Sequence, residues 1–295
     1  MTTDWLETNR GAVARWEVDH NGHLTVAYYF ERFGHASLAM LDAFGLGLAY
    51  AERERRACVT VDGYVRYARE LGVGDILHIA TGVIDADAAG LTLGHKLFNS
   101  ETGAVCATFE QRLLHVALAD RTPVDLTATQ RRDAEARRVL WDVPARERRP
   151  PPRGTEGFRD TARDSVDPRD LDPLGETGMA FYIHRFSAAN GHAIAAFGMT
   201  PSYMRDEHRG FSTFEFQLTF AGRVRAGDTV SVKTGLLHVG SSSIRLFHSM
   251  TNERSGERVA TLEQLGVHLD MDARRPTPLP DALRDKARAL LAPTG

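Results

Sequence analysis

The segment GDILHIATGVIDADAAGLTLGHKLFNSETGAVCATFEQRLLH, residues 74–115, returns 153 residues later as GDTVSVKTGLLHVGSSSIRLFHSMTNERSGERVATLEQLGVH, residues 227–268. The two segments align without a gap, and the identical pairs include His95 with His248 and Gln111 with Gln264. Chance seldom places so many identities in one register, so the chain contains a duplicated unit. Two copies of this size are typical of a dimer fused into one polypeptide, not of a solenoid.

A shorter match lies upstream, where Asn21-Gly22-His23 returns as Asn190-Gly191-His192. This pair is 169 residues apart, so the alignment predicts 16 extra residues between the two matches in the first copy. It also places Ala188 opposite Asp19. The second copy's helix is then expected at about 193–205, and it would be shorter because Pro201 breaks or kinks a helix.

Each copy is expected to hold one helix and a set of antiparallel strands. Apolar residues recur at helical spacing from Val26 to Phe44, and Gly45 is a plausible C-terminal stop. Alternation predicts short strands at 12–18 and 180–186, and turn residues separate further strand-like runs at 76–84, 91–98 and 104–118. A long helix and an antiparallel meander form an α+β unit in which the helix covers the apolar face of the sheet.

The domain boundaries follow from this pattern and from the composition of the connection. We expect a first repeat at 1–125, a helix and Pro/Arg-rich linker at 126–175, a second repeat at 176–272 and a C-terminal tail at 273–295. Within the linker, ERRPPPRG (147–154) cannot be a core element. A polar helix is expected over 126–140, charged loop over 160–172 and a short amphipathic helix over 282–291.

The composition is that of an ordinary globular protein. Apolar residues make up 42% and charged residues 25%, and the formal net charge of -3 argues against a general polyanion binder such as a nucleic-acid-binding protein. No stretch approaches the roughly 20 apolar residues that span a bilayer, and the N-terminus has no signal-peptide pattern. We therefore expect a cytoplasmic protein. Cys58 and Cys106 lie in apolar, strand-like contexts and are expected to be buried, reduced thiols.

The stretch WEVDHNGHLTVAYYFE, residues 16–31, resembles the 4-hydroxybenzoyl-CoA thioesterase family of hotdog enzymes. The family pattern is Asp-x-x-Gly-His followed by two asparagines and a tyrosine, and it is matched here by Asp19, Gly22, His23 and Tyr28 or Tyr29, with Glu31 following. Thr25 and Val26 stand where the asparagines are usual. The resemblance implies two fused hotdog repeats, each an antiparallel sheet wrapped around a central helix, and hydrolysis of an acyl-CoA thioester.

The chemistry of the motif agrees with that activity. Asp19 can act as nucleophile or as general base, although a helix N-cap is its ordinary structural alternative. His23 can orient the carboxylate or donate a proton to the leaving thiolate. Backbone N–H groups after Gly22 and in the first helical turn form a site for the oxyanion. We expect Asn21, Gly22 and Tyr28 to contribute to this oxyanion or substrate site.

The second copy is expected to lack a site of its own, because Ala188 has no carboxylate. One working site per chain would then use Asp19, with Asp206 and Glu207 as candidate contributions from the second copy. Residues found in both copies are expected to have structural roles: His95, His248, Glu110, Glu263 and His192, which the alignment places opposite His23. The basic linker residues Arg146, Arg148, Arg149 and Arg153 are solvated or contact the phosphates of CoA.

Three alternatives remain open on the same fold: an acyl-carrier-protein thioesterase, an enoyl-CoA hydratase, and a catalytically inactive acyl-CoA-binding protein. The spacing of histidine, cysteine and carboxylate residues gives no metal-ligand set, so no metal is expected. No cofactor is expected either, because CoA is part of the substrate. The fused unit is a candidate for further homo-oligomerisation through exposed sheet edges.

Overall fold

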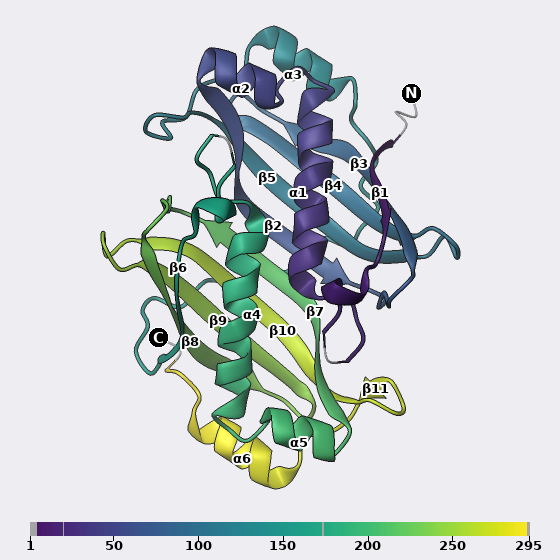
Figure 1. The fold of residues 1–295 in the computed structure, drawn as a ribbon, viewed down its shortest axis with the longest axis vertical. Helices are drawn as coiled ribbons and strands as arrows, with labels where there is room; N and C mark the ends of the chain where they lie inside the picture. Colours follow the sequence, from purple (N-terminus) through teal and green to yellow (C-terminus); the bar gives the residue numbers. More distant parts are fainter. Residues whose placement is uncertain (1–4, 20, 173, 294–295) are drawn as a thin grey trace. The chain divides into compact units, whose positions relative to one another are not determined.

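The computed structural model describes residues 5–19, 21–172 and 174–293. The chain forms two compact units, of which the first comprises residues 1–146 and 172–180 and the second residues 147–171 and 181–295. Each unit contains one antiparallel sheet and one long helix that crosses a face of that sheet (Figure 1). The fold class expected from the sequence is therefore correct.

In the first unit the strands follow the order β1-β3-β4-β5-β2, and each neighbouring pair is antiparallel. Their bounds are Leu6–Ala12 (β1), Ile76–Ala86 (β3), Gly90–Asn99 (β4), Val105–Ala117 (β5) and Arg56–Tyr67 (β2). A 3-10 turn, η1 (Arg15–Glu17), leads towards the long helix α1 (Val26–Asp42), which is drawn in purple in Figure 1. Two short helices complete the unit, α2 (Leu48–Glu54) and α3 (Ala128–Glu135).

The second unit repeats this arrangement with the order β7-β10-β9-β8-β6. Its strands are Arg209–Phe220 (β7), Arg258–Asp270 (β10), Ser243–Asn252 (β9), Thr229–Val239 (β8) and Arg159–Ser165 (β6), and the two-residue β11 (Arg275–Pro276) pairs with β10. Its helices are η2 (Pro168–Asp170), α4 (Met179–Ala195), α5 (Pro201–Asp206) and α6 (Asp281–Ala289).

A single offset of 153 residues relates the two copies, so the upstream alignment at 169 is wrong. Both α1 and α4 have 17 residues, and α4 begins 153 positions after α1. The tripeptide Asn190-Gly191-His192 lies inside α4, whereas Gly22 precedes α1 with a φ of +79°. The true counterpart of Gly22 is Gly175, with a φ of +76°. The tripeptide recurs by coincidence. The alignment matched residue types only, and these do not show that Gly22 needs a left-handed backbone in a turn whereas Gly191 lies in a helix.

The revised alignment and the structure change four further expectations. The counterpart of Asp19 is Asp172, not Ala188. The predicted strand at 180–186 belongs to α4, and the predicted loop at 160–172, placed in the linker, contains β6 and η2. Pro201 breaks no helix, because it occupies the first turn of α5, where a missing N–H costs nothing. The short helices expected near 126–140 and 282–291 are present as α3 and α6.

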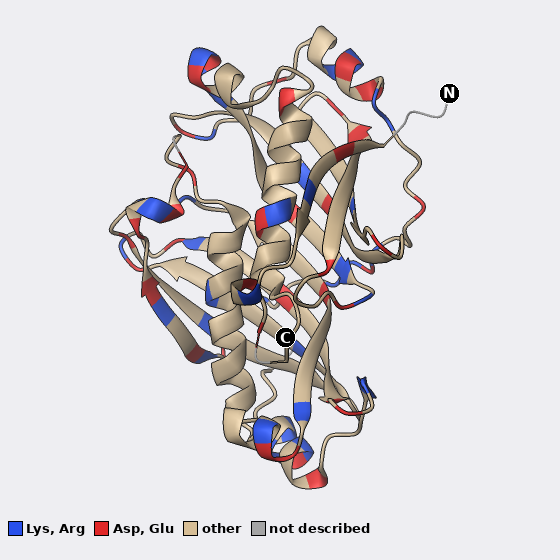
Figure 2. Cartoon of the chain, turned by 45° about the vertical axis from the view of Figure 1, so that its right-hand side comes forward, with Lys and Arg blue, Asp and Glu red and all other residues tan. Residues whose placement is uncertain are grey.

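The core of the first unit lies between α1 and its sheet. Phe30 and Phe33 on the helix are fully buried, and the ring of Phe109 on β5 lies 5.0 Å from that of Phe33. Burial of each such side chain contributes about 1.5–3 kcal/mol. The two long helices are mostly tan in Figure 2, because α1 carries only Glu31, Arg32 and Asp42 and α4 only Arg185 among Lys, Arg, Asp and Glu. They are therefore held to the sheets by apolar contacts.

A row of hydrogen bonds crosses each sheet beneath its helix, and we call it the polar belt. In the first unit one residue comes from each strand: Thr8, Thr81, His95, Gln111 and Thr60. Neighbouring side chains along the row are joined at 2.7, 2.8, 3.0 and 2.7 Å. The second unit holds the same residue types at Thr161, Thr234, His248, Gln264 and Thr213. Both histidines thus lie in buried networks, as expected for a structural role.

Candidate active site

The segment between η1 and α1 forms a tight turn around the carboxylate of Asp19. Its Oδ1 accepts hydrogen bonds from the backbone N–H groups of Asn21 at 2.8 Å and His23 at 3.2 Å. Its Oδ2 accepts from Nδ2 of Asn21 at 3.3 Å. The N–H of Gly22 donates to the backbone oxygen of Asp19 at 3.0 Å. Asp19 is not the helix N-cap, because that position belongs to Thr25.

His23 joins this turn to the loop between β2 and β3. Its Nε2 lies 3.0 Å from Oε2 of Glu70, and the imidazole is 18% exposed. Next to it, the N–H of Leu24 donates to the backbone oxygen of Leu71 at 2.7 Å. The structure therefore places a carboxylate against His23 that the sequence analysis missed. Glu70 lies 47 residues from His23 in the sequence, so no local motif connects them. The sequence differs between the copies at this position, with Arg223 in place of Glu70, and this difference could have drawn attention to Glu70.

The backbone N–H groups directly after Gly22 are already hydrogen-bonded within the fold. His23 donates to Asp19, Leu24 to Leu71, and Thr25 to the backbone oxygen of Glu17 at 2.8 Å. The first two N–H groups of α1, those of Val26 and Ala27, remain. Within the described part of the chain they have no intrahelical acceptor, as is general for the first turn of a helix. These two N–H groups are therefore the candidates for an oxyanion contact.

The other predicted site residues are placed less centrally. Tyr28 lies half-buried in the first turn of α1, and its N–H donates to the backbone oxygen of Thr25. Tyr29 is buried instead, with its ring 5.2 Å from that of Tyr67. Burial raises the pKa of Tyr29 well above its usual value.

Asp206 and Glu207 do not lie on the long helix of the second copy, as the earlier alignment assumed. That helix is α4, and the two acidic residues stand at the exposed C-terminal end of the short helix α5. Acidic side chains at a helix C-terminus face the negative end of its dipole, so local structure gives them no stabilising role. Their part in a site stays a prediction.

The turn is repeated in the second copy around Asp172. Oδ1 of Asp172 accepts from the N–H groups of Leu174 at 2.8 Å and Glu176 at 2.9 Å, and Gly175 donates to its backbone oxygen at 2.9 Å. The backbone turn is therefore conserved between the copies, and only its side chains differ.

Two of those side chains, Leu174 and Glu176, bind the second turn to neighbouring parts of the fold. Leu174 replaces Asn21 and packs against an apolar cluster that includes Ala51 and Leu118. Glu176 replaces His23, is 8% exposed and forms an ion pair with Arg121. An apolar anchor and a buried ion pair give this turn a structural part.

Two of the four linker arginines form ion pairs with the strands, and Arg148 and Arg153 are exposed. Arg146 contacts Asp62 at 2.5 Å, and its side chain is 6% exposed. Arg149 binds both Glu215 and Glu263. These two arginines are therefore neither solvated nor available to a CoA phosphate. Glu263 has the structural bond expected of it.

Cys58 and Cys106 are free thiols. Burial raises the pKa of Cys58 to about 12 and also raises the pKa of Cys106. Both are therefore protonated at neutral pH, which agrees with the expected structural role and with poor reactivity.

Comparison with known proteins agrees with the duplicated fold. The family model of the thioesterase-like superfamily matches residues 13–145 and again residues 166–287, so that one match covers each copy. The chain belongs to this superfamily. The oleoyl thioesterase (putative) of Lactobacillus plantarum has a similar structure, with a TM-score of 0.73 at 14% identity over 92% of this chain and 97% of that one. The fold is a double hotdog.

Curated relatives match about a third of the chain. The betainyl-CoA thioesterase of Pseudomonas aeruginosa is 30% identical over 101 residues, which are 34% of this chain and 64% of that one. The L-carnitine dehydrogenase/betainyl-CoA thioesterase of Rhizobium meliloti is 33% identical over 103 residues, 35% of this chain and 20% of that one. The chain thus spans less than two thirds of either relative. No helix in the described ranges is long and apolar enough to cross a membrane.

Proposed function

We propose that the protein hydrolyses an acyl-CoA thioester at the Asp19 turn. The observation that carries the proposal is the carboxylate of Asp19, held by two backbone N–H groups just before the N-terminus of α1. Membership of the thioesterase-like superfamily supports the same reaction. The chemistry needs a carboxylate, a proton donor and an oxyanion site, and it needs no metal or further cofactor.

Each group at the site has a separate role in the proposed reaction. Asp19 acts as nucleophile on the thioester carbonyl or as the base that activates water. The N–H groups of Val26 and Ala27 stabilise the oxyanion, which is usually the largest single contribution in acyl transfer. His23, held by Glu70, donates a proton to the departing thiolate. Asn21 keeps the carboxylate of Asp19 in place.

We infer one working site per chain, although the reason differs from the one drawn from the sequence alone. The second copy keeps the carboxylate in Asp172, so its loss is not the cause. Leu174 and Glu176 replace the polar residues Asn21 and His23 and are used for packing and for an ion pair. The second turn therefore offers neither the amide nor the imidazole that the reaction requires.

The relatives that carry the name betainyl-CoA thioesterase suggest a first substrate to test. A betainyl group bears a quaternary ammonium next to the thioester, and this positive charge would be attracted by a carboxylate. Short, polar acyl groups with a positive charge are therefore the proposed substrate class. The alternative substrate is a thioester of an acyl-carrier protein.

The test is a thiol-release screen of the purified chain against acyl-CoAs of graded length, polarity and charge, betainyl-CoA included. Release of free CoA by the wild type, with preference for a short cationic acyl group, supports the proposal. Loss of enoyl absorbance without thiol release would indicate a hydratase instead. Binding of acyl-CoAs without turnover of any would leave a binding protein and contradict the proposal.

A further inference from the structure

Two buried side chains connect the segment before the Asp19 turn to α1. Nη2 of Arg32 donates to Oε2 of Glu17 at 2.8 Å, and each of the two side chains is 11% exposed. The same carboxylate oxygen accepts from the N–H of Ala14 at 2.7 Å. Burial by itself raises the pKa of Glu17, but the bonds from Arg32 and Ala14 outweigh it and lower that pKa. The pair is therefore ionised at neutral pH.

Arg32 reaches two more backbone oxygens from its position on α1. Nη2 donates to the oxygen of Ala12 at 2.9 Å, and Nη1 donates to that of Tyr28 at 3.5 Å. One guanidinium thus contacts the end of β1, the turn η1 and the first turn of α1. Only the planar fork of arginine presents several donors in such a fixed arrangement, so lysine cannot replace it.

Glu17 also fixes the far end of the turn segment. Its backbone oxygen accepts the N–H of Thr25 at 2.8 Å, and Thr25 is the N-cap of α1. Glu17 and Thr25 therefore flank residues 18–24 and hold both ends of this segment together. Asp19 and His23 lie between these two fixed points, and the N–H of Asp19 donates to the oxygen of His23 at 2.8 Å.

We propose that Arg32 and Glu17 are positioning residues of the active site, which hold the Asp19 turn in register with the N-terminus of α1. This inference rests on the function proposed above. A nucleophile or base and its oxyanion site must keep their mutual distance, and a displacement of about 1 Å can cost on the order of 100-fold in rate. The ion pair acts on the reaction only through the Asp19 turn.

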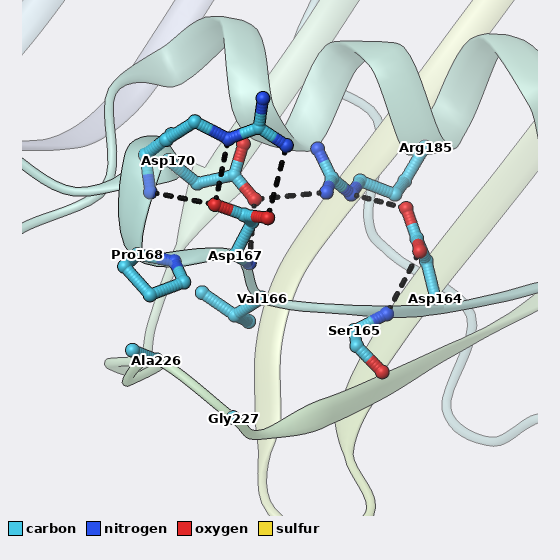
Figure 3. Close-up of a pocket in the computed structure, with 10 residues that line it drawn as sticks. Asp164, Ser165, Val166, Asp167, Pro168, Asp170, Arg185, Ala226 and Gly227 are labelled. Atoms are coloured by element: carbon cyan, nitrogen blue, oxygen red, sulfur yellow. Dashed lines mark hydrogen bonds and ion pairs between the residues drawn. The ribbon is translucent and has the colours of Figure 1, made fainter.

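The second copy supplies a matched control at Arg185, the counterpart of Arg32. Figure 3 shows its guanidinium between two carboxylates, those of Asp164 and Asp170, each at 3.1 Å. Arg185 also lies over the ring of Phe181, 3.8 Å from its centre, beside an open groove of about 770 Å³. The Arg185 side chain is 12% exposed, close to the 11% of Arg32, whereas its partners Asp170 and Asp164 are 24% and 55% exposed. Asp170 precedes the Asp172 turn, to which we assign no catalysis.

The experiment compares Arg32→Lys with Arg185→Lys in the full chain, using the acyl-CoA that the wild type hydrolyses fastest. We expect Arg32→Lys to lower kcat by about tenfold or more while KM changes by less than about threefold. Arg185→Lys should keep kcat within about twofold of wild type at a similar loss of melting temperature. If Arg32 had only a structural role, the two variants would lose melting temperature but would show no difference in kcat.

Two results would overturn the proposal: an Arg32→Lys enzyme that keeps kcat within about twofold, or an equal loss of kcat in Arg185→Lys. Glu17→Gln and Asp170→Asn form a second pair, judged by the same criteria, which decides the matter if Arg32→Lys does not fold. Failure of the proposed function is distinguishable, because it appears as wild type without thiol release, or as full activity in Asp19→Asn.

Discussion

Nδ1 of His95 lies 2.8 Å from the hydroxyl oxygen of Thr81, and both side chains are fully buried. On the other side of the ring, Nε2 faces Oε1 of Gln111 at 3.0 Å. An amide oxygen only accepts, so the proton of the neutral ring is on Nε2 and Thr81 donates to Nδ1. The directions of the bonds in the polar belt follow from this one assignment.

Removal of the Thr81 hydroxyl should therefore destabilise the fold. Thr81→Val leaves Nδ1 of His95 buried without a donor, which costs about 1–3 kcal/mol of unfolding free energy. Thr234→Val should cost a similar amount through His248, whose Nδ1 lies 2.7 Å from that hydroxyl. Urea denaturation of both variants measures the effect. A change below about 0.5 kcal/mol in both would show that the belt adds nothing to stability.

The two belt histidines should make stability depend on pH. Burial lowers the pKa of His95 and of His248 to about 4. Because the unfolded chain binds these protons near pH 6.5, the unfolding free energy is fully present above about pH 6.5 and falls as the pH decreases towards 4.

Unfolding free energies at pH 7.5 and pH 5 measure this dependence. His95→Asn and His248→Asn should each reduce the difference between the two values. Carboxylates whose pKa is lowered in the fold, such as Asp167 at about 2, lose their contribution only at lower pH and do not interfere. A wild-type protein equally stable at both pH values would contradict the assignment.

Gly22 should matter for activity more than for stability. Its φ of +79° is a left-handed conformation, and a Cβ there would meet no atom within 4 Å, so backbone strain is the sole penalty. Gly22→Ala is expected to cost about 1–2 kcal/mol and to reshape the Asp19 turn. Gly175→Ala imposes the same strain on the second turn, where φ is +76°.

Melting temperatures and kcat of the two glycine variants give the comparison. We expect similar losses of stability but a loss of kcat in Gly22→Ala alone. Equal activity in the two variants would count against a special role of the first turn.

Glu70 is expected to assist His23 in catalysis. Glu70→Gln keeps the shape of the side chain but removes the charge that faces Nε2 of His23 at 3.0 Å. The imidazolium form of His23 then loses its partner, and kcat should fall by about tenfold.

The matched control for this variant is Glu52→Gln, an exposed substitution on α2. It should leave kcat unchanged. If Glu70→Gln behaves in the same way, the contact with His23 has no catalytic part.

Most of the fold could be predicted from the sequence because the strand-forming segment occurs twice in the chain. Identities such as His95 with His248 placed the sheets in register, and helical spacing from Val26 placed α1. The upstream alignment failed at Asn190, because three matching letters carry no information about backbone conformation. A comparison of Gly22 with Gly175 needs the left-handed φ that both share.

The site was predictable only in its local part. Asp19, Gly22 and His23 are neighbours in the chain, so one motif contains them. Glu70 and the buried pair of Glu17 with Arg32 join the site through the fold, and no spacing rule connects them.

Of the two turns, which share the same backbone hydrogen bonds, only the one around Asp19 is proposed to be catalytic. Steady-state thiol release from the preferred acyl-CoA, measured for Asp19→Asn and Asp172→Asn side by side, tests it most directly. Asn keeps the size of the side chain but removes the charge, so both variants should fold. We predict that Asp19→Asn loses at least about 100-fold in kcat and that Asp172→Asn stays within about twofold of wild type. Near-wild-type turnover by Asp19→Asn, or an equal loss in both variants, would contradict the account.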